Sequence, residues 1–334
     1  MPKVSIIVPC YNEEKTISLL LNSIYEQTYA VKDMEVVISD GLSEDATRQR
    51  IKEFQQEKPD LQIILIDNIK RNIPAALNAA LRASQGEYIV RMDAHSVPAK
   101  NYVEKSIQDL EAGVADNVGG VWQIKPGDST WIAESIAKAA SHPLGVGDAG
   151  YRYSKESGYV DTVPFGAFKK NLIEEIGFFD EELLSNEDYE FNTRIRQNGG
   201  KVWFNADISC VYYARKNLKA LAKQYFRYGF WKYKMLRRYP ETIRWRQALP
   251  PIFVLGMISL LILSMFSGIG GLLFFFTFFV YADILVFGSY KSAASEDKPY
   301  YIFGIPLAIM TMHFCWGTGF LWSVIESINK KDEK

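Results

Sequence analysis

Short apolar runs rich in β-branched residues alternate with segments of helical periodicity along the first part of the chain. The runs are typical of buried strands, which are predicted at Val4 to Val8, Glu35 to Ser39, Leu61 to Ile66 and Tyr88 to Met92. Between them, helical spacing of apolar residues predicts helices over Ile17 to Ile24, from Glu44, and over Pro74 to Ala83. This alternation predicts an α/β fold in which helices cover both faces of a mainly parallel central sheet.

Carboxylates follow three of the predicted strands. Asp40, Asp67 and Asp93 stand at strand ends, where parallel sheets bind their ligands. The sequence contains neither the Gly-x-Gly-x-x-Gly fingerprint of dinucleotide redox enzymes nor the Gly-x-x-x-x-Gly-Lys-Ser/Thr loop of P-loop NTPases. Because an acidic rim repels pyrophosphate, it favours a nucleotide that is held partly through a divalent cation.

The last part of the chain is far more apolar than the rest. Between Gln247 and Tyr290 the one charged residue is Asp283, which we expect to face protein, water or a polar headgroup. Ser267-Gly268 divides this stretch into two segments close to the ~20 residues that cross a bilayer, Leu249 to Phe266 and Ile269 to Phe287. They predict a helical hairpin in the membrane; the alternative is a buried hairpin of a soluble domain.

A third uncharged stretch runs from Tyr300 to Ile325 and contains Gly304 and Pro306, which disturb helices. It is either a third span or a re-entrant segment. Three spans would place Lys330, Lys331 and Lys334 outside the cell, which the positive-inside rule disfavours. The sequence therefore leaves two or three transmembrane helices open.

The formal charge of -1 hides a strong partition along the chain. Residues 1–213 carry a net charge of -10, whereas residues 214–246 carry 11 basic residues and one acid, Glu241. Arg237, Arg238, Arg244 and Arg246 directly precede the first span, which places that flank in the cytoplasm by the positive-inside rule. We expect a multi-pass protein of the cytoplasmic membrane with its globular part in the cytoplasm.

These features predict four regions. They are a catalytic domain over residues 1–213, a basic amphipathic interfacial segment over 214–246, a membrane region over 247–327 and a polar tail over 328–334. The three cysteines, Cys10, Cys210 and Cys315, are odd in number and far apart, which argues against a disulfide framework or a cysteine-rich metal site.

Asp93-Ala94-His95 is the first candidate site. It follows a predicted strand, and alternate positions can direct a carboxylate and an imidazole at one Mn²⁺ or Mg²⁺ ion. Taken alone, the pattern is more typical of a strand-terminal Asp that caps a helix and of a structural histidine than of a metal site.

Glu187 and Asp188 form the second candidate site, at the start of a helix that ends near Gly199-Gly200. Ser185 or Asn186 is the expected N-cap, and acids in the first turn complement the helix dipole without any catalytic role. A carboxylate here can also act as a general base if it faces the cleft. The spacing does not determine which acid does so.

The third candidate lies in the basic segment. Leu218, Leu221, Ala222 and Tyr225 recur at helical spacing among basic and aromatic residues, which predicts an interfacial helix attracted to anionic membrane lipids. Gln224 and Arg227, three positions apart, are expected on one face, where they can also hold a diphosphate.

Together these motifs resemble the family 2 glycosyltransferases, which have the GT-A fold. The resemblance covers roughly residues 3–235 and rests on Val8-Pro-Cys-Tyr-Asn-Glu13, Asp40-Gly41, Asp93-Ala-His95, Glu187-Asp188 and Gln224-x-x-Arg227-Tyr228. Within the family, the chain is most similar to bacterial succinoglycan-type exopolysaccharide glycosyltransferases with a C-terminal membrane region.

The resemblance implies an inverting transfer of a sugar from a nucleoside-diphosphate sugar, with UDP favoured, to a lipid-linked or growing saccharide. It implies a hexosyltransferase of exopolysaccharide or cell-surface glycan synthesis, a Mn²⁺ or Mg²⁺ cofactor and no nucleic-acid partner. Asp188 would be the base, and Asp93 and His95 would sit at the metal. The donor pocket would comprise Pro9, Tyr11, Glu13, Asp40, Arg71, Asn78 and Asp93. The diphosphate and acceptor would meet Glu187, Gln224, Arg227, Tyr228, Phe165, Gly166 and Ala167.

Two departures from the family pattern bear on these roles. The usual Asp-x-Asp reads Asp93-Ala94-His95, which changes one metal ligand, and the usual Gln-x-x-Arg-Trp ends in Tyr228. The second departure weakens the alternative of a processive polysaccharide synthase. A catalytically silent membrane scaffold of the same fold and a nucleotidyltransferase are further alternatives.

Overall fold

The computed structural model describes residues 2–329, and residues 330–334 of the predicted polar tail lie outside this range. Within the described chain, one nine-stranded sheet has the order β3-β2-β1-β4-β8-β6-β9-β5, with β7 paired to β9. The strands are β1 (Val4–Cys10), β2 (Met34–Asp40), β3 (Gln62–Asp67), β4 (Tyr88–Arg91), β5 (Val97–Pro98), β6 (Asn117–Lys125), β7 (Gly158–Tyr159), β8 (Ala167–Lys169) and β9 (Val202–Tyr213).

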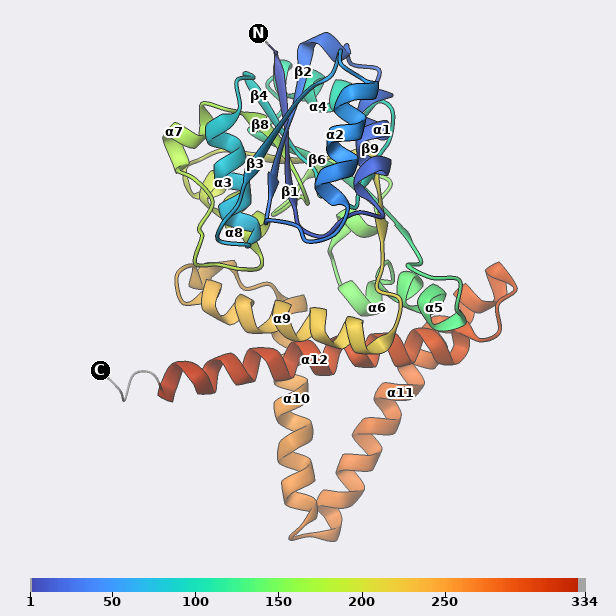
Figure 1. Ribbon diagram of the computed structural model, residues 1–334. Helices are drawn as coiled ribbons and strands as arrows, with labels where there is room; N and C mark the ends of the chain where they lie inside the picture. Colours follow the sequence, from blue (N-terminus) through green and yellow to red (C-terminus); the bar gives the residue numbers. More distant parts are fainter. Residues whose placement is uncertain (1, 330–334) are drawn as a thin grey trace. The chain divides into compact units, whose positions relative to one another are not determined.

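The four strands predicted from the sequence form the parallel part of this sheet. β1 pairs in parallel with β2 and β4, and β2 pairs in parallel with β3. β8 adds antiparallel pairings to β4 and β6, and β5 and β7 pair antiparallel with β9, so the complete sheet is mixed. The α/β prediction is confirmed, and the parallel strands bring their carboxyl ends to one edge, as Figure 1 shows.

Helices cover the two faces of this sheet and bury an apolar core on each. They are α1 (Ile17–Tyr25), α2 (Thr47–Glu57), α3 (Ile73–Ala83), α4 (Tyr102–Glu111), α7 (Leu172–Ile176) and α8 (Glu187–Gln197). One core contains Ile17, Leu20 and Ile51 against one face of β1 and β2, and the other contains Leu77, Phe168 and Phe191 against the opposite face. Alternate residues of β1, such as Ile6 and Ile7, enter different cores because side chains alternate along a strand.

The chain divides into two compact units. The first comprises residues 1–123 and 150–212, and the second comprises residues 124–149 and 213–334. One boundary between the units falls near residue 213, where the predicted catalytic domain ends. Residues 124–149 differ from the prediction, because α5 (Trp131–Ala139) and α6 (Pro143–Val146) pack with the C-terminal helices. Ile136 and Ala139 share a buried cluster there with Ile305 and Ile309, which explains the assignment.

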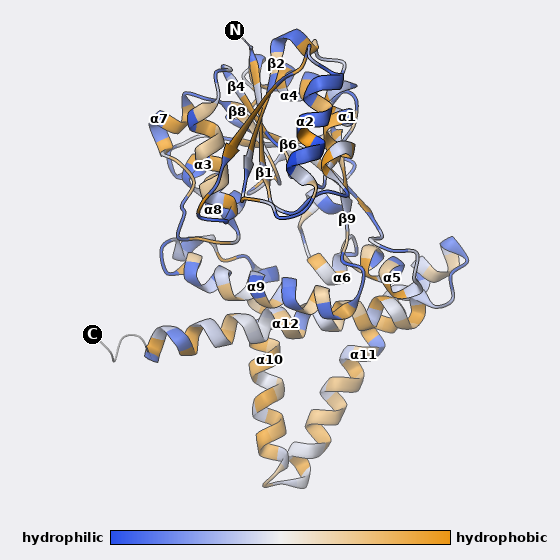
Figure 2. Cartoon of the chain, in the orientation of Figure 1, coloured by the Kyte–Doolittle hydropathy of each residue, from blue (hydrophilic) through white to orange (hydrophobic). Residues whose placement is uncertain are grey.

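The second unit contains the predicted basic helix and membrane hairpin. α9 (Leu218–Leu236) precedes α10 (Trp245–Ser264), α11 (Gly268–Glu296) and α12 (Tyr301–Asn329). α10 and α11 form an antiparallel hairpin (Figure 1), and most of its residues are hydrophobic (Figure 2). All three C-terminal helices are long and apolar enough to cross a membrane. Asp283 is exposed on α11.

α12 is one continuous helix despite Gly304 and Pro306, and it lies along α9 and across the base of the hairpin (Figure 1). Gly229 of α9 and Gly319 of α12 permit this close contact. A Cβ at Gly229 would lie 2.0 Å from the Trp316 carbonyl oxygen, and one at Gly319 would lie 2.2 Å from that of Phe226. Small residues at both crossings therefore let the two backbones touch.

Candidate active site

The loops after β1, β2 and β3 meet at the carboxyl edge of the parallel strands. Cys10 is aligned with Asp40, and Asp40 with Asp67, so the three strands end at the same level. Asn12 and Ser43 join the first two loops, because the Asn12 backbone N–H donates to the Ser43 hydroxyl over 2.8 Å. Asn12, Leu42 and Arg71 have positive φ values of 55°, 59° and 50°, which fold these loops sharply back over the edge.

Tyr11 and Arg71 come together here, as predicted for the donor pocket. The Arg71 guanidinium lies 5.6 Å from the centre of the exposed Tyr11 ring. Tyr11 packs over Gly41, where a Cβ would lie 3.0 Å from the Tyr11 ring. The arrangement presents an aromatic face and a cation on one surface, which suits a nucleobase and a phosphate.

Asp40 and Pro9 are buried beneath these loops. The Asp40 carboxylate is 0% exposed, accepts from the Ser43 hydroxyl over 2.5 Å and from the Ser43 N–H over 2.9 Å, and lies 3.5 Å from Arg48. Arg48 also pairs with Asp67 at 2.6 Å. Two of the strand-terminal carboxylates therefore shape the loop, and Asp40 offers no exposed surface to a ligand in this structure.

Glu13 and His95 are brought together although they are far apart in the sequence. His95 Nδ1 lies 2.9 Å from Glu13 Oε1, and Glu13 Oε2 accepts from the Thr16 hydroxyl over 2.5 Å. This contact orients the imidazole in the way that carboxylates orient metal-bound histidines.

The most highly charged part of the site surrounds Arg91, at the end of β4. Its guanidinium donates to Glu187 over 3.0 Å, to Asp93 over 3.2 Å and to Asp188 at close range. The Arg91 side chain is 2% exposed, whereas that of Asp188 retains 26% exposure. Three carboxylates against one guanidinium leave the cluster with an excess of negative charge.

Asp188 has the environment of a base that works near neutral pH. Desolvation raises the pKa of its carboxyl to about 7, and the charges of Glu187 and Asp93 act in the same direction. Arg91 and the backbone N–H of Phe165 act in the opposite direction, because they stabilise the carboxylate. Of the two acids, Asp188 has the more exposed side chain, 26% against 11% for Glu187, and its role as the base stays a prediction.

The N-cap of α8 is Asn186, one of the two residues expected there. Asn186 occupies the N-cap position in a left-handed conformation with φ 68°, and its side chain makes no capping hydrogen bond. The three acids of the first turn, Glu187, Asp188 and Glu190, instead pair with arginines or face the site.

Three predicted acceptor residues are buried and line no open surface. Phe165 is 5% exposed, Ala167 is 0% exposed, and Gly166 is buried. Phe165 and Gly166 have φ values of 65° and 75°, and a Cβ at Gly166 would lie 2.5 Å from Asn117 Oδ1. They form the turn whose Phe165 N–H stabilises the Asp188 carboxylate, and their contact with the acceptor stays a prediction.

Asn78 is buried and fully engaged in hydrogen bonds. It is 1% exposed, and its amide donates to the Phe179 carbonyl and to Glu181 and accepts from the Phe179 N–H, each over 2.9 Å. These bonds fasten α3 to the segment before α8. A direct role of Asn78 in closing the donor pocket stays a prediction.

Gln224, Arg227 and Tyr228 belong to α9 in the second unit. Gln224 is buried and donates from its amide to the Tyr228 hydroxyl over 2.8 Å, whereas Arg227 is exposed. Gln224 and Arg227 thus lie three positions apart on one helix, but one side chain is buried and the other is exposed. Their contact with a diphosphate stays a prediction.

Within residues 2–329, no group of three or more His, Cys, Asp or Glu side chains is arranged to hold a metal ion. Asp93 and the oriented His95 nevertheless fit an open cation site, since Mg²⁺ and Mn²⁺ commonly take one or two protein ligands and complete their shell with phosphate oxygens and water. The negative excess around Arg91 favours a cation in the same place.

Sequence reasoning missed Arg91. The signal was present, because a charged residue ends the otherwise apolar strand Tyr88-Ile-Val-Arg91 immediately before the Asp-Ala-His motif. An isolated arginine in a strand does not reveal which carboxylates it will meet, since two of its partners lie almost one hundred positions later.

Comparison with known proteins places the chain in a family. The family model for glycosyl transferase family 2 matches residues 5–177. The chain is 28% identical over 327 residues to a dolichyl N-acetyl-α-D-glucosaminyl phosphate 3-β-D-2,3-diacetamido-2,3-dideoxy-β-D-glucuronosyltransferase of Methanococcus voltae, covering 97% of both chains. It is 28% identical to succinoglycan biosynthesis protein ExoA of Rhizobium meliloti, covering 94% of this chain and 93% of that protein.

Its fold is shared with a solved structure. Mannosyltransferase PcManGT of Pyrobaculum calidifontis, in complex with GDP-Man and Mn²⁺, superposes with a TM-score of 0.66 at 21% identity, over 96% of this chain and 87% of that one. The resemblance of the motifs, the matching family model and the GT-A architecture agree. The chain therefore belongs to glycosyl transferase family 2 and is a glycosyltransferase.

Proposed function

We propose that this glycosyltransferase moves a sugar from a nucleoside-diphosphate sugar to a lipid-linked saccharide at the cytoplasmic surface of a membrane, with inversion at the anomeric carbon. The observation that carries the proposal is Asp188, a partly exposed carboxylate with a pKa near 7 at the carboxyl edge of the sheet. A base with such a pKa is half deprotonated at neutral pH and can take a proton from a hydroxyl in the transition state.

In the proposed step, an acceptor hydroxyl gives its proton to the Asp188 carboxylate while its oxygen attacks the anomeric carbon. The bond from that carbon to the diphosphate oxygen breaks, and the nucleoside diphosphate leaves with the bonding electron pair. Attack opposite to the leaving group inverts the configuration. Tyr11 and Arg71 hold the nucleotide beside the loops of β1 and β3, and Glu187 stays paired with Arg91.

Asp93 and His95 would hold a divalent cation, which would neutralise charge on the diphosphate. PcManGT was solved with GDP-Man and Mn²⁺, which supports a nucleotide sugar and a cation in this fold. The Methanococcus voltae relative is named for a dolichyl-phosphate-linked acceptor, and this supports a lipid-linked acceptor here. We retain a UDP-sugar as the favoured donor.

The α10–α11 hairpin is the proposed membrane anchor. Large apolar side chains such as Leu255, Ile262, Phe276 and Phe287 are exposed along its surface, which bulk water would disfavour. By the positive-inside rule, the basic residues before α10 support a cytoplasmic position for its start.

α12 is proposed to lie in the membrane surface instead of crossing it. In its apolar 18-residue segment 44% of residues are buried, compared with 22% in α10 and 11% in α11. Its large exposed apolar residues lie on one stripe at helical spacing: Phe303, Leu307, Trp322, Ile325 and Ile328. The opposite face carries α9, whose Lys234 pairs with Glu326 at 3.4 Å, and a transmembrane α12 would pull this basic helix into hydrocarbon.

The catalytic proposal is tested with the full chain in lipid nanodiscs. UDP-glucose, UDP-N-acetylglucosamine, UDP-glucuronic acid and GDP-mannose are each offered with Mn²⁺ and dolichyl-phosphate-linked N-acetylglucosamine. We expect transfer from at least one donor, with an inverted linkage by NMR, and loss of transfer in Asp188→Asn. The absence of both sugar transfer and donor hydrolysis with every donor of this panel would contradict the proposed function.

The topology is tested by reporter fusions after the C-terminal residue and by cysteine labelling at Ser267, which lies at the tip of the hairpin. Two spans with an in-plane α12 predict a cytoplasmic reporter and labelling of Ser267→Cys from outside the cell. A reporter outside the cell would instead show that α12 crosses the membrane.

A further inference from the structure

Arg91 occupies a position where the strand pattern calls for an apolar residue. Ile89 and Val90, which precede it in β4, are both 0% exposed, and β4 is enclosed by β1 and β8. The Arg91 backbone N–H donates to the Gly166 carbonyl over 3.0 Å, which fixes its main chain against the turn that also contacts Asp188. Placing a guanidinium in such a site is costly unless it is fully compensated.

The compensation comes from both sides of the site. Asp93, at the proposed cation site, and Glu187 share one terminal nitrogen of Arg91, and Asp188 takes the other. The Phe165 ring lies 6.0 Å from the guanidinium and restricts it further. Arg91 thus links a loop on the donor side of the sheet to the first turn of α8.

We propose that Arg91 is a positioning residue that holds the Asp188 carboxylate in the orientation needed to take the acceptor proton. The inference rests on the proposed role of Asp188 as the base. Asp188 lies in the first turn of α8, and its carboxylate accepts from the Arg91 guanidinium and the Phe165 N–H, which fix its direction. A planar guanidinium presents its N–H donors at fixed angles, whereas an ammonium is a compact charge whose three donors rotate on a flexible stem.

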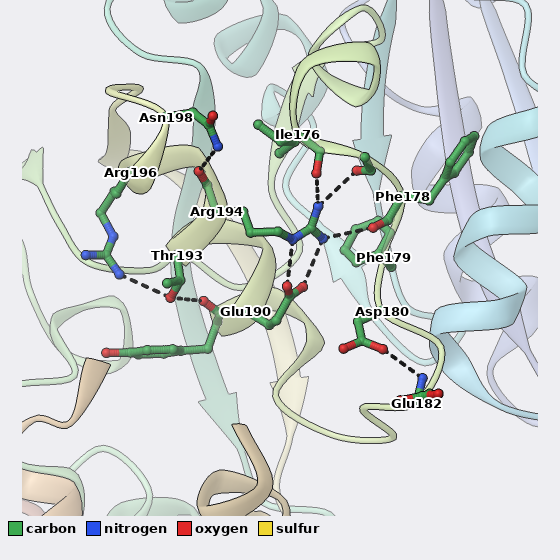
Figure 3. A network of polar contacts seen from close by, with 12 residues as sticks. Ile176, Phe178, Phe179, Asp180, Glu182, Glu190, Thr193, Arg194, Arg196 and Asn198 are labelled. Carbon is green, nitrogen blue, oxygen red and sulfur yellow. Dashed lines mark hydrogen bonds and ion pairs between the residues drawn. The ribbon is translucent and has the colours of Figure 1, made fainter. Parts of the chain in front are cut away.

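A second arginine on the same helix shows what a purely structural ion pair looks like. Arg194 pairs with Glu190 through bonds of 2.6 and 2.9 Å and donates to the backbone carbonyls of Ile176, Gly177 and Phe178 (Figure 3). These contacts fasten the middle of α8 to the segment after α7. They involve none of the carboxylates around Arg91, so Arg194 provides a matched control.

The test compares Arg91→Lys, Asp188→Asn and their double variant with Arg194→Lys, in the full chain in nanodiscs with Mn²⁺, the dolichyl-phosphate-linked acceptor and the donor of the panel above that gives turnover. Arg91→Lys should lower kcat about 100-fold, as expected for a misplaced catalytic group, and leave the donor KM unchanged. Arg194→Lys should leave kcat unchanged. Because Arg91 acts through Asp188, adding Arg91→Lys to Asp188→Asn should cause no further loss.

Two results would overturn the role of Arg91 and leave Asp188 as the base. The first is a loss of kcat in the double variant that equals the product of the two single losses. The second is a raised donor KM with normal kcat in Arg91→Lys. Full activity of Asp188→Asn would instead overturn the base itself, so the two failures are distinguishable. Thermal unfolding of each variant checks folding. If Arg91→Lys does not fold, a double variant with Arg91→Gln and Glu187→Gln replaces it, because this pair of changes keeps the net charge of the cluster. Relative to Glu187→Gln alone, the double variant should show the loss of kcat expected for Arg91→Lys.

Discussion

The two units of the chain distribute charged and apolar side chains in opposite ways. The first gathers Arg91, Asp93, Glu187 and Asp188 into a largely buried cluster beneath a polar edge. The second turns large apolar residues outward along α10 and α11. Both arrangements cost free energy in water, because charge is desolvated in one and hydrocarbon is hydrated in the other. In the proposed function, each marks where the molecule meets something other than water: a reacting sugar in the first unit and a lipid bilayer in the second.

The largest effect is expected from removing the partly exposed carboxylate of the cluster. Asp188→Asn keeps the shape of the side chain but cannot accept the acceptor proton, so kcat should fall by about 10²- to 10⁴-fold. Asp207→Asn, at an exposed position of β9, is the control and should transfer normally. Equal rates in the two variants, measured as product formed per minute, would show that burial of charge in the first unit has no catalytic meaning.

The same cluster predicts a pH profile. Since the carboxyl of Asp188 has a pKa of about 7 and must be deprotonated to act, kcat/KM should be constant above pH 7 and fall about tenfold per pH unit below it. The measurement is initial transfer rate from pH 5 to 9 at a fixed Mn²⁺ concentration. The residual activity of Asp188→Asn should lack this limb. A limb that persists unchanged in the variant would assign the titration to another group.

In the second unit, the contact between α9 and α12 depends on two glycines. Gly229→Leu would drive a side chain into the Trp316 carbonyl oxygen, 2.0 Å from the Cβ position, and should lower stability by about 1–3 kcal/mol or more. Gly256→Leu on α10 is the control, because among the described residues no heavy atom outside its chain neighbours and its own helix backbone lies within 4 Å of its Cβ position. Thermal unfolding in nanodiscs compares them. Equal midpoints would mean that α9 and α12 do not need to touch.

The sequence predicted the parts of both units that depend on local pattern. Periodicity and motifs alone predict the strands β1 to β4, the carboxylates at their ends, the hairpin of α10 and α11, and the acids that start α8. Three features could not be predicted in this way: the ion pairs of Arg91, the burial of Asn78 and Phe165, and the packing of residues 124–149 with α12. Each depends on contacts between residues far apart in the chain. α12 illustrates the difference best, since its composition resembles a span and only its contact with basic α9 argues for an in-plane position.

The smallest effect is expected where charge is neither buried nor near the chemistry. Lys70 pairs with Glu181 at 2.6 Å, but its side chain is 69% exposed, and water and salt screen the attraction. Lys70→Ala should therefore change the free energy of unfolding by about 0–1 kcal/mol and leave kcat unaltered. Denaturant unfolding of the variant, at low and at high salt, measures this directly. Glu181 is also the partner of Asn78 beneath the site. A loss of kcat as large as that of Arg91→Lys would therefore show that this exposed ion pair, although it is distant from the buried cluster, supports catalysis.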